Sequence, residues 1–459
     1  MLTLLTSGVI FPCMHRSHST DDATASSPGD GSGSVADHIA RATSPVFEPL
    51  TLGNGATLPN RIAKAAMEEN MAAPGQLPGN ELDTLYRRWS AGGAGLLITG
   101  NVMVHDAALT GPAGVVLDGD QPLEPFRRWA AAAKSGGSRV WMQINHPGRQ
   151  VQANMPGVAW APSAKRLDVG KQSGLFAEPT AMTESQIRET IDRFAATARL
   201  AEEAGFDGVE IHAAHGYLLS QFLSPLSNLR TDEWGGSLDG RARLLVEVVR
   251  AVRAAVAPDF AVAVKLNSAD FQRGGFEAAD ARRVIDMVAP LSVDLVELSG
   301  GSYESPAMSG SPDPSGDVRT RAREAYFLEL ATELAATSPI PLMLTGGITR
   351  LPVAEEVLGE GVAVVGMGSA LAMDPDLPDA WRRDASAKVT IAPVTIKNKT
   401  IGSAMSMARV RSQLRRLGAG KATRPGANPW LAFAVDQVRQ RIALRHYRRW
   451  LAAREGRRR

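Results

Sequence analysis

The sequence predicts an α/β fold of the (β/α)8 barrel type, also called a TIM barrel, with an additional segment at each end. From Phe47 onward, short apolar runs alternate with amphipathic stretches, which is the pattern of a parallel sheet covered by helices. Eight such runs fall within about 320 residues, a length that suits this barrel with insertions. We therefore expect a disordered N-terminal extension over residues 1–45, the barrel over 46–385 and a basic helical extension over 386–459.

The predicted strands are short and rich in Val, Ile, Leu and Ala. They cover Arg61–Ala66, Gly95–Gly100, Arg139–Asn145, Gly208–His212, Ala261–Leu266, Val293–Leu298, Pro341–Thr345 and Val362–Gly366. The predicted helices cover Glu81–Ala91, Leu123–Lys134, Glu184–Ala204, Asp239–Ala255, Glu277–Val288, Arg321–Ala336 and Leu351–Leu358. A doubly wound open sheet is the alternative, but the Gly-x-Gly-x-x-Gly turn of a dinucleotide-binding sheet does not follow the first strand.

The segment Glu184–Ala204 shows how a helix is recognised. Thr183 is a suitable N-cap residue, and Gly205 is a suitable residue to end the helix. Between them, apolar side chains recur at spacings of three and four, so that one face can pack on the sheet. These side chains are Ile187, Ile191, Phe194, Ala198 and Ala201.

Composition narrows the class of protein. The chain is 44% hydrophobic and 21% charged, and no apolar run approaches the roughly 18 residues of a membrane-spanning helix. The run Leu2–Cys13 lacks a preceding Lys or Arg and is interrupted by Pro12, so it does not resemble a signal peptide, and we expect a cytoplasmic protein. Cys13 is the only cysteine, which excludes an internal disulfide and a multi-cysteine cluster. A net charge of +2 gives no general attraction to nucleic acid.

The C-terminal segment is strongly basic. Trp430–Arg459 has apolar residues at helical spacing, and nine arginines lie between Arg439 and Arg459. One interpretation is a helix docked on the barrel with a solvated arginine face. The other is a surface for acidic partners or for peripheral contact with anionic lipid. The sequence leaves both open, and homo-oligomerisation is open as well.

The stretch from Gly208 to Tyr217 predicts a functional site. A buried strand ends in His212, and His215 and Tyr217 follow directly, so three proton-carrying groups lie at the end of a strand where such barrels keep their chemistry. The histidines could instead be core residues or metal ligands. Glu210 shares a strand face with His212 and is a conceivable ligand, but the sequence offers no credible third one, so we predict no metal site.

The same stretch and its continuation carry a family resemblance. Residues 208–237, which include Leu218–Pro225 and Asn228–Ser237, closely resemble the strand-four signature of the old yellow enzymes, which are FMN-dependent ene-reductases. The resemblance implies a barrel that binds FMN and takes hydride from NADH or NADPH. It also implies that His212 and His215 donate hydrogen bonds to the oxygen of a small-molecule substrate and that Tyr217 is the proton donor.

The resemblance also implies which residues bind the flavin. Ala65, Ala66 and Met67 at the end of strand one would pack on its ring, with Gly100 at the end of strand two. Gln143 would hydrogen-bond the pyrimidine edge, and Lys265 would place a positive charge beside N1 and O2. The phosphate would lie at two glycine pairs after strands seven and eight. The residues implied there are Gly346, Gly347, Gly368 and Ser369.

Two residues depart from the family pattern. Relatives usually have an arginine where this chain has Ser369, and a threonine or cysteine where it has Glu68. The first departure could weaken the retention of FMN. The sequence therefore predicts an FMN-dependent reductase of activated C=C bonds, and leaves two alternatives. These are a flavin enzyme that acts on amines or degradation intermediates, and a flavin-free barrel that serves as a binding or scaffold protein.

Overall fold

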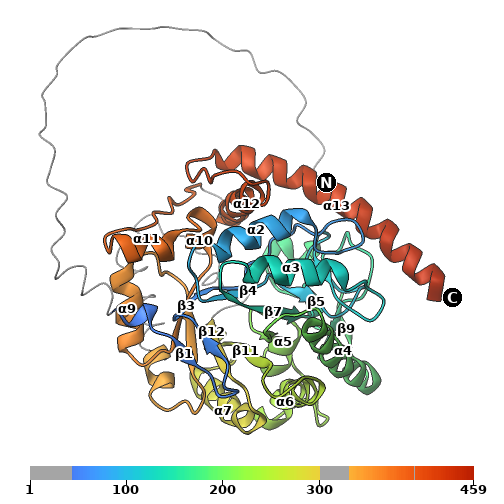
Figure 1. The fold of residues 1–459 in the computed structure, drawn as a ribbon. Coiled ribbons are helices and arrows are strands. Elements are labelled where there is room, and N and C mark those ends of the chain that lie inside the picture. The colour runs from blue at the N-terminus through green and yellow to red at the C-terminus, as the bar shows by residue number, and fades with distance from the viewer. Residues whose placement is uncertain (1–43, 300–329, 397–398, 459) are drawn as a thin grey trace, which may run out of the picture. The chain divides into compact units, whose positions relative to one another are not determined.

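The computed structural model describes residues 44–299, 330–396 and 399–458, and within them it shows a closed parallel barrel (Figure 1). Eight strands of the main sheet form the ring, because the eighth strand in the sheet order also pairs with the first. In ring order they are β3 (Ile62–Lys64), β4 (Leu96–Ile98), β7 (Arg139–Asn145), β10 (Gly208–Ala213), β11 (Ala261–Asn267), β12 (Leu295–Ser299), β13 (Leu342–Thr345) and β14 (Val364–Met367). The predicted (β/α)8 barrel is confirmed, and the open-sheet alternative is wrong.

Helices cover the outside of the ring. The larger ones are α2 (Asn80–Ser90), α3 (Glu124–Lys134), α4 (Glu184–Glu203), α6 (Leu238–Ala255), α7 (Ala278–Val288) and α9 (Leu351–Gly359), and all six were predicted to within one or two residues. Residues 330–335 are also helical, whereas the earlier part of the predicted helix Arg321–Ala336 lies outside the described residues. The same holds for residues 1–43 of the predicted disordered extension, which was expected to cover residues 1–45. Its last two residues are ordered, because Ser44 is buried and Pro45 begins a 3-10 turn.

Several short elements were not predicted. The added strands are β1 (Leu50–Thr51), β2 (Thr57–Leu58), β5 (Val102–Met103), β6 (Val115–Val116), β8 (Trp160–Ala161) and β9 (Thr180–Ala181). The added helices are α5 (Leu218–Leu223), α10 (Ser369–Met373) and α11 (Leu377–Arg383), with short 3-10 turns at Pro45–Phe47, Gly148–Gln150, Gly170–Leu175 and Ala289–Leu291. Most are too short to show a periodicity of their own.

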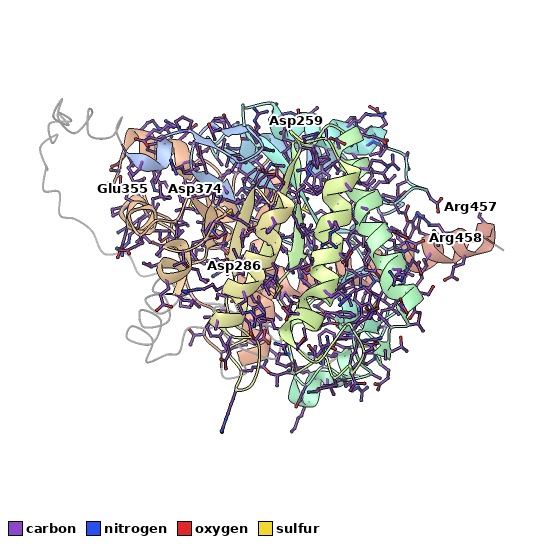
Figure 2. All side chains as sticks on the ribbon, turned by 90° about the horizontal axis from the view of Figure 1, so that it is seen from below. Asp259, Asp286, Glu355, Asp374, Arg457 and Arg458 are labelled. Atoms are coloured by element: carbon purple, nitrogen blue, oxygen red, sulfur yellow. The ribbon has the colours of Figure 1, made fainter. Side chains whose placement is uncertain are left out.

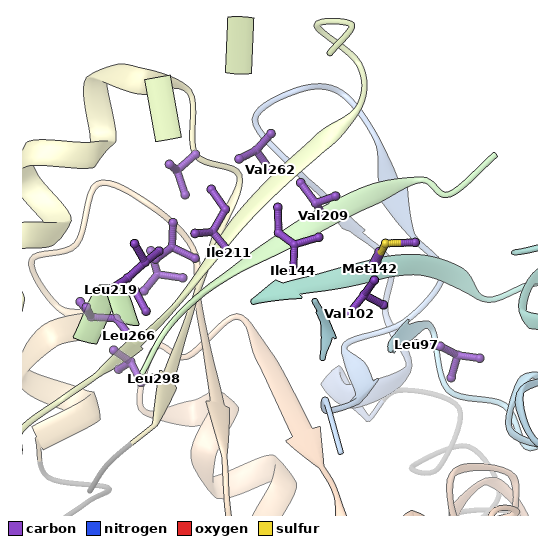
Figure 3. Close-up of a cluster of buried hydrophobic side chains, with 14 of the residues drawn as sticks. Leu97, Val102, Met142, Ile144, Val209, Ile211, Leu219, Val262, Leu266 and Leu298 are labelled. Carbon is purple, nitrogen blue, oxygen red and sulfur yellow. The ribbon is translucent and has the colours of Figure 1, made fainter. Parts of the chain in front are cut away.

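Two separate apolar layers hold the barrel together. Side chains that point inward near the start of the strands, such as Ala63, Trp141 and Leu295, form a cluster inside the ring. Outward-pointing side chains such as Val209 and Val262 pack against the helices in a second, larger cluster (Figure 3). Strand residues alternate between these layers because successive side chains point to opposite faces. A side chain on the inner face further along a strand therefore approaches the C-terminal mouth.

Helix α4 shows the predicted capping. The side chain of Thr183 accepts a hydrogen bond from the amide of Gln186, and the side chain of Gln186 accepts one from the amide of Thr183, which forms a capping box. Gly205 ends the helix with a φ of 86°, a conformation that glycine adopts without steric cost.

The C-terminal extension is helical and docked. It consists of α12 (Lys399–Gly418) and α13 (Pro429–Arg458), which lie outside the ring of barrel helices in Figure 1. Asp436 of α13 is buried between Arg411 and Arg415 of α12. Further along α13, the hydroxyl of Tyr447 donates to the backbone oxygen of Asp106 at 2.9 Å. Within the described ranges, no helix is long and apolar enough to cross a membrane.

Candidate active site

The inner face of the barrel changes from apolar to polar toward the C-terminal ends of the strands. On β10, Glu210 and His212 follow one another on this face, and β11 continues from Ala263 to Lys265. The ladder register places His212 beside Lys265, and Lys265 beside Glu297 of β12. Because all the strands are parallel, these groups meet at one end of the barrel, where a site can form.

His212 and His215 are joined in a hydrogen-bonded chain. The Nδ1 atom of His212 accepts from the amide of Ala214 at 3.2 Å, so the proton of a neutral His212 ring lies on Nε2. That Nε2 lies 3.3 Å from Nδ1 of His215, and Nε2 of His215 lies 2.6 Å from the hydroxyl of Ser299. The network therefore assigns the same tautomer, with the proton on Nε2, to both rings.

Both histidines are neutral near pH 7. Burial lowers the pKa of His215 to about 3, with a further lowering from the positive charge of Lys265. Burial also lowers the pKa of His212 well below its usual value; a proton on the neighbouring His215 would lower it further, as the positive charge of Lys265 does. A neutral imidazole is one donor and one acceptor, so each ring can offer a single N–H to a substrate.

The turn after β10 is held rigidly by amide side chains. His215 has a φ of 62°, a left-handed conformation that is uncommon outside glycine. Its amide donates to Oδ1 of Asn267 at 3.0 Å. The side-chain amide of Gln150 donates to the carbonyl oxygens of His215 and Gly216, and that of Gln221 also donates to Gly216. These contacts offset the strain of the turn and orient the His215 ring.

Tyr217 lies beside the two histidines. It is the residue before α5, is 5% exposed, and its ring meets the ring of His212 edge-on, with centroids 4.9 Å apart. The rings of His212 and His215 are 5.0 Å apart. The structure thus brings together the three residues that the sequence predicts to be catalytic.

Gln143 and Lys265 engage two carboxylates inside the barrel. The side-chain amide of Gln143 donates to Glu210 at 2.6 Å, and the ammonium group of Lys265 contacts Glu297. All four residues are buried. Burial and the charge of Glu297 raise the pKa of Glu210 well above its usual value. Although burial opposes ionisation of Glu297, the adjacent Lys265 lowers its pKa, and Glu297 is the charged partner.

The other predicted flavin-binding residues line the neighbouring strand ends. Ala65 follows β3, and its amide donates to the carbonyl oxygen of Met367 on β14. Ala66 and Met67 are half-buried, and the side chain of Met67 lies beside Gly368. Gly100 follows β4. A larger residue does not fit there, because a Cβ atom would lie 1.8 Å from Oε2 of Glu69.

A buried ionic group lies behind Gly100, on the outer face of β3. The ammonium group of Lys64 donates to the hydroxyl of Tyr86 and to the carbonyl oxygen of Ile98, and it lies 3.6 Å from Glu69. The hydroxyl of Tyr86 in turn donates to Glu69, which also accepts from the amide of Gly100. Burial lowers the pKa of Lys64 to about 8, although Glu69 opposes this shift.

The two glycine corners fit a phosphate group. Gly346 and Gly347 are exposed, with φ values of 139° and 68°, and a Cβ atom at Gly346 would meet open space. No residue in the described part of the chain accepts a hydrogen bond from their amides. Ser369, the first residue of α10, is also exposed, and β14 lies next to both β13 and β3. Accessible amides at adjoining strand ends suit an anion, so the residues present fit a flavin phosphate.

Glu68, the second departure from the family pattern, is half-buried and accepts a hydrogen bond from the hydroxyl of Thr110. Its carboxylate is therefore tied to the segment between β5 and β6. The predicted pocket loop Ser302–Arg319 lies outside the described residues.

Sequence reasoning missed several residues of this site. Every second residue of a strand points to the same face, which is why Glu210 and His212 share the inner face of β10. On β12, Leu295 points inward, so the same rule would have placed Glu297 and Ser299 in the site. Asn267 follows from the same rule on β11. In contrast, no local pattern marks Lys64 or Glu69, whose partners come from α2 and β4. Among the described residues, no group of three or more His, Cys, Asp or Glu side chains is arranged to hold a metal ion.

Comparison with known proteins gives a consistent result. The model of the NADH:flavin oxidoreductase / NADH oxidase family matches residues 45–385, limits that lie next to the predicted barrel boundaries. The chain is 38% identical over 351 residues to the NADH-dependent flavin oxidoreductase iliE of Hypocrea jecorina (strain QM6a), which covers 72% of this chain and 87% of that protein. It is 37% identical over 396 residues to the protein of the same name from Neonectria sp. (strain DH2), where it spans 82% of this chain but only 51% of the relative.

A solved structure shares the fold. The old yellow enzyme homologue from Zymomonas mobilis superposes with a TM-score of 0.62 at 25% sequence identity, over 75% of this chain and 95% of that one. The superposition covers nearly all of the solved structure but only three quarters of this chain, as expected for a barrel with additional segments.

Proposed function

Because the chain belongs to the NADH:flavin oxidoreductase / NADH oxidase family, which includes the old yellow enzymes, we propose that it reduces the activated C=C bond of an α,β-unsaturated carbonyl or related compound. The chain is an oxidoreductase with FMN as its cofactor and NADH or NADPH as its reductant. FMN, when bound, accepts hydride from the nicotinamide and supplies it to the substrate.

The observation that carries the proposal is the contact of His212, His215 and Tyr217 at the mouth of the barrel. Two neutral donors side by side suit an oxygen that becomes negative during reaction, because preorganised N–H groups stabilise developing charge. In the structure, the N–H of His212 points to His215. The N–H of His215 points to the hydroxyl of Ser299. Substrate binding must open both contacts so that the two N–H groups reach the same oxygen.

The remaining residues would bind the flavin and orient it and the substrate. Ala65, Ala66, Met67 and Gly100 would pack on the flavin, and the amides at Gly346, Gly347, Gly368 and Ser369 would hold its phosphate. Gln143 would face the pyrimidine edge. Lys265 would supply the positive charge near N1, moderated by Glu297. Tyr217 would give its hydroxyl proton to the α-carbon of the substrate after hydride transfer.

The flavin-free scaffold alternative is not supported, because family membership makes the chain an enzyme and the glycine corners are accessible to an anion. A cytoplasmic location, a homo-oligomer and the domain boundaries at residues 45 and 385 stay predictions.

The test separates the two half-reactions. The purified protein should show the absorption bands of oxidised flavin and lose them when NADH or NADPH is added without oxygen. Mixing the reduced protein with 2-cyclohexenone should restore the bands and yield cyclohexanone. If NADH bleaches the flavin but neither an enone nor a nitroalkene restores it faster than buffer does, the protein is a flavin oxidoreductase but not an ene-reductase.

A further inference from the structure

The outward face of α13 carries an apolar stripe that nothing in the described part of the chain covers. Exposed apolar residues recur there at spacings of four and three, which places them on one side of a helix. They are Leu431, Val435, Val438 and Ile442, with exposed fractions of 65%, 44%, 55% and 47%, and Trp430 precedes them at 58%. Exposed large apolar side chains are ordinary one at a time, but a continuous row of them marks an interaction surface.

The opposite face of α13 holds the helix in place. Ala432 and Asp436 are buried toward α12, and Tyr447, Leu451 and Arg454 are buried toward the barrel. Arg454 contacts Asp106, which follows β5, and Asp118, which follows β6. The stripe is therefore presented by a helix that is anchored at both ends, and its exposure is a feature of the docked structure.

The surface around and beyond the stripe is positive. Five exposed arginines occupy the flanks and the continuation of the same face, and they are Arg439, Arg441, Arg445, Arg448 and Arg449. No acidic residue lies between Asp436 and Arg454 in the sequence, and Asp436 is already paired. Arg457 adds positive charge at the end of the helix (Figure 2), whereas Arg458 is paired with Asp106 and Asp120.

We propose that the outward face of α13 binds the surface of a bilayer that contains anionic phospholipid. Apolar side chains on one side of a helix enter the boundary between headgroups and acyl chains, and flanking arginines bind lipid phosphates. Guanidinium groups suit this role because their donors match the geometry of phosphate oxygens. The protein would lie on the membrane without spanning it.

A second copy of the chain fits this face less well. A standard interface buries about 800 Å² on each partner, whereas the stripe offers five partly exposed side chains. Its flanks carry arginines and no exposed acidic residue to complement those of another copy. An insertion into lipid needs no such area, because electrostatic attraction and a few apolar side chains act together.

The experiment measures binding of the full-length, flavin-loaded protein to vesicles by flotation. One vesicle type is phosphatidylcholine alone, and the other contains about one-third phosphatidylserine. We expect at least about tenfold stronger binding to the anionic vesicles at low salt, and weakening as the salt concentration rises. Two variants test the face. The first replaces the four aliphatic residues of the stripe by serine, and the second replaces Arg439, Arg441, Arg445 and Arg449 by glutamine.

Each variant should lose at least about tenfold in binding while keeping the flavin spectrum of the parent. A matched control removes the same amount of positive charge from exposed positions on α4 and α6 and should bind as the parent does. It replaces Arg188, Arg199, Arg243 and Arg250 by glutamine.

Three results would overturn the proposal. They are equal binding to both vesicle types, unchanged binding of the stripe variant, and a loss of binding in the control as large as in the α13 arginine variant. A dimer seen by light scattering that disappears in the stripe variant, without vesicle binding by the parent, would assign the face to a second copy instead.

Discussion

Tyr217 is the residue whose proposed role is most separable, because a proton is needed only after hydride has left the flavin. Its ring lies edge-on to His212, and Tyr217→Phe keeps this packing while removing the hydroxyl. We expect reduction by NADH to be unchanged and oxidation by 2-cyclohexenone to slow by about 10²–10⁴-fold. Stopped-flow measurement of each half-reaction checks this, with a nitroalkene as a less affected substrate because its nitronate is stable before protonation. An enone rate equal to that of the parent would remove Tyr217 as the proton donor.

Ser369 stands where the family resemblance implies an arginine, and it is exposed at the start of α10. The variant Ser369→Arg should hold FMN more tightly, since a charge-assisted contact with phosphate typically contributes about 1.5–3 kcal/mol. Equilibrium titration of the apoprotein with FMN measures the effect, and Ser369→Gln, which adds length without charge, is the control. An arginine variant with no gain over the parent would show that another group already fills this role.

Glu297 is a buried counter-ion whose loss leaves Lys265 without its partner. Removing one member of a buried ion pair typically costs about 3–5 kcal/mol, so Glu297→Gln should lower the free energy of unfolding by an amount of that order. Chemical denaturation measures it. The control Glu189→Gln breaks a partly exposed pair with Arg193 on α4 and should cost at most about 1 kcal/mol. Equal losses in the two variants would contradict the role of Glu297.

At the scale of elements, α13 is attached to the barrel through Arg454. This side chain is 3% exposed and pairs with Asp106, Asp118 and Asp120. Arg454→Met should leave the buried Asp106 with Arg458 as its one remaining charged partner among the described residues, and should destabilise the docked helix by on the order of 3 kcal/mol. Hydrogen exchange of the α13 amides should then rise, while the strands of the barrel stay protected.

Deletion of Gly456–Arg459 is the matched control for this helix. It removes Arg458 but keeps Arg454, and all predicted catalytic and flavin-binding residues precede α11. Flavin content and turnover should therefore equal those of the intact chain. A deletion that releases FMN, or an Arg454 variant with parental exchange rates, would show that the helix is held in another way.

At the scale of the whole molecule, buried neutral histidines make stability depend on pH. Burial lowers the pKa of His105 and of His215 to about 3 each, and burial also lowers the pKa of His146 and His212 well below the usual value. The unfolded chain takes up protons on these rings below about pH 6.5, whereas the folded chain does not until about pH 3. The free energy of unfolding should therefore fall as the pH drops through this window.

Thermal or denaturant unfolding between pH 7 and pH 4 measures this slope. The variant His105→Phe should have a smaller slope than the parent, whatever its stability at pH 7, because one titrating ring is gone. Gln437→Ala, at an exposed position on α13 that carries no titrating group, is the control and should leave the slope unchanged. A His105 variant with the slope of the parent would contradict this origin of the pH dependence.

The sequence by itself determined the order of the elements and the location of the site. Alternating apolar runs and amphipathic helices are local patterns, so strand β10, helix α4 and the cap at Thr183 could be read directly. The strand-four signature placed His212, His215 and Tyr217 together, because residues so close in the sequence share one strand end and one turn. The sequence allowed α13 to be docked on the barrel but did not establish it. An arginine-rich helix has the same sequence pattern whether its arginines face solvent or pair with carboxylates.

Only the tertiary structure decided the partners that come from distant segments. Lys265 meets Glu297, Gln143 meets Glu210, and Lys64 meets Tyr86 and Glu69, each across neighbouring strands or a helix. Arg454 also pairs with Asp118 and Asp120, which precede it in the sequence by 336 and 334 residues. The position of a charged residue in the sequence does not show which residue it pairs with. An unpaired charge becomes costly only when folding removes it from water, so its partner is decided when the barrel closes.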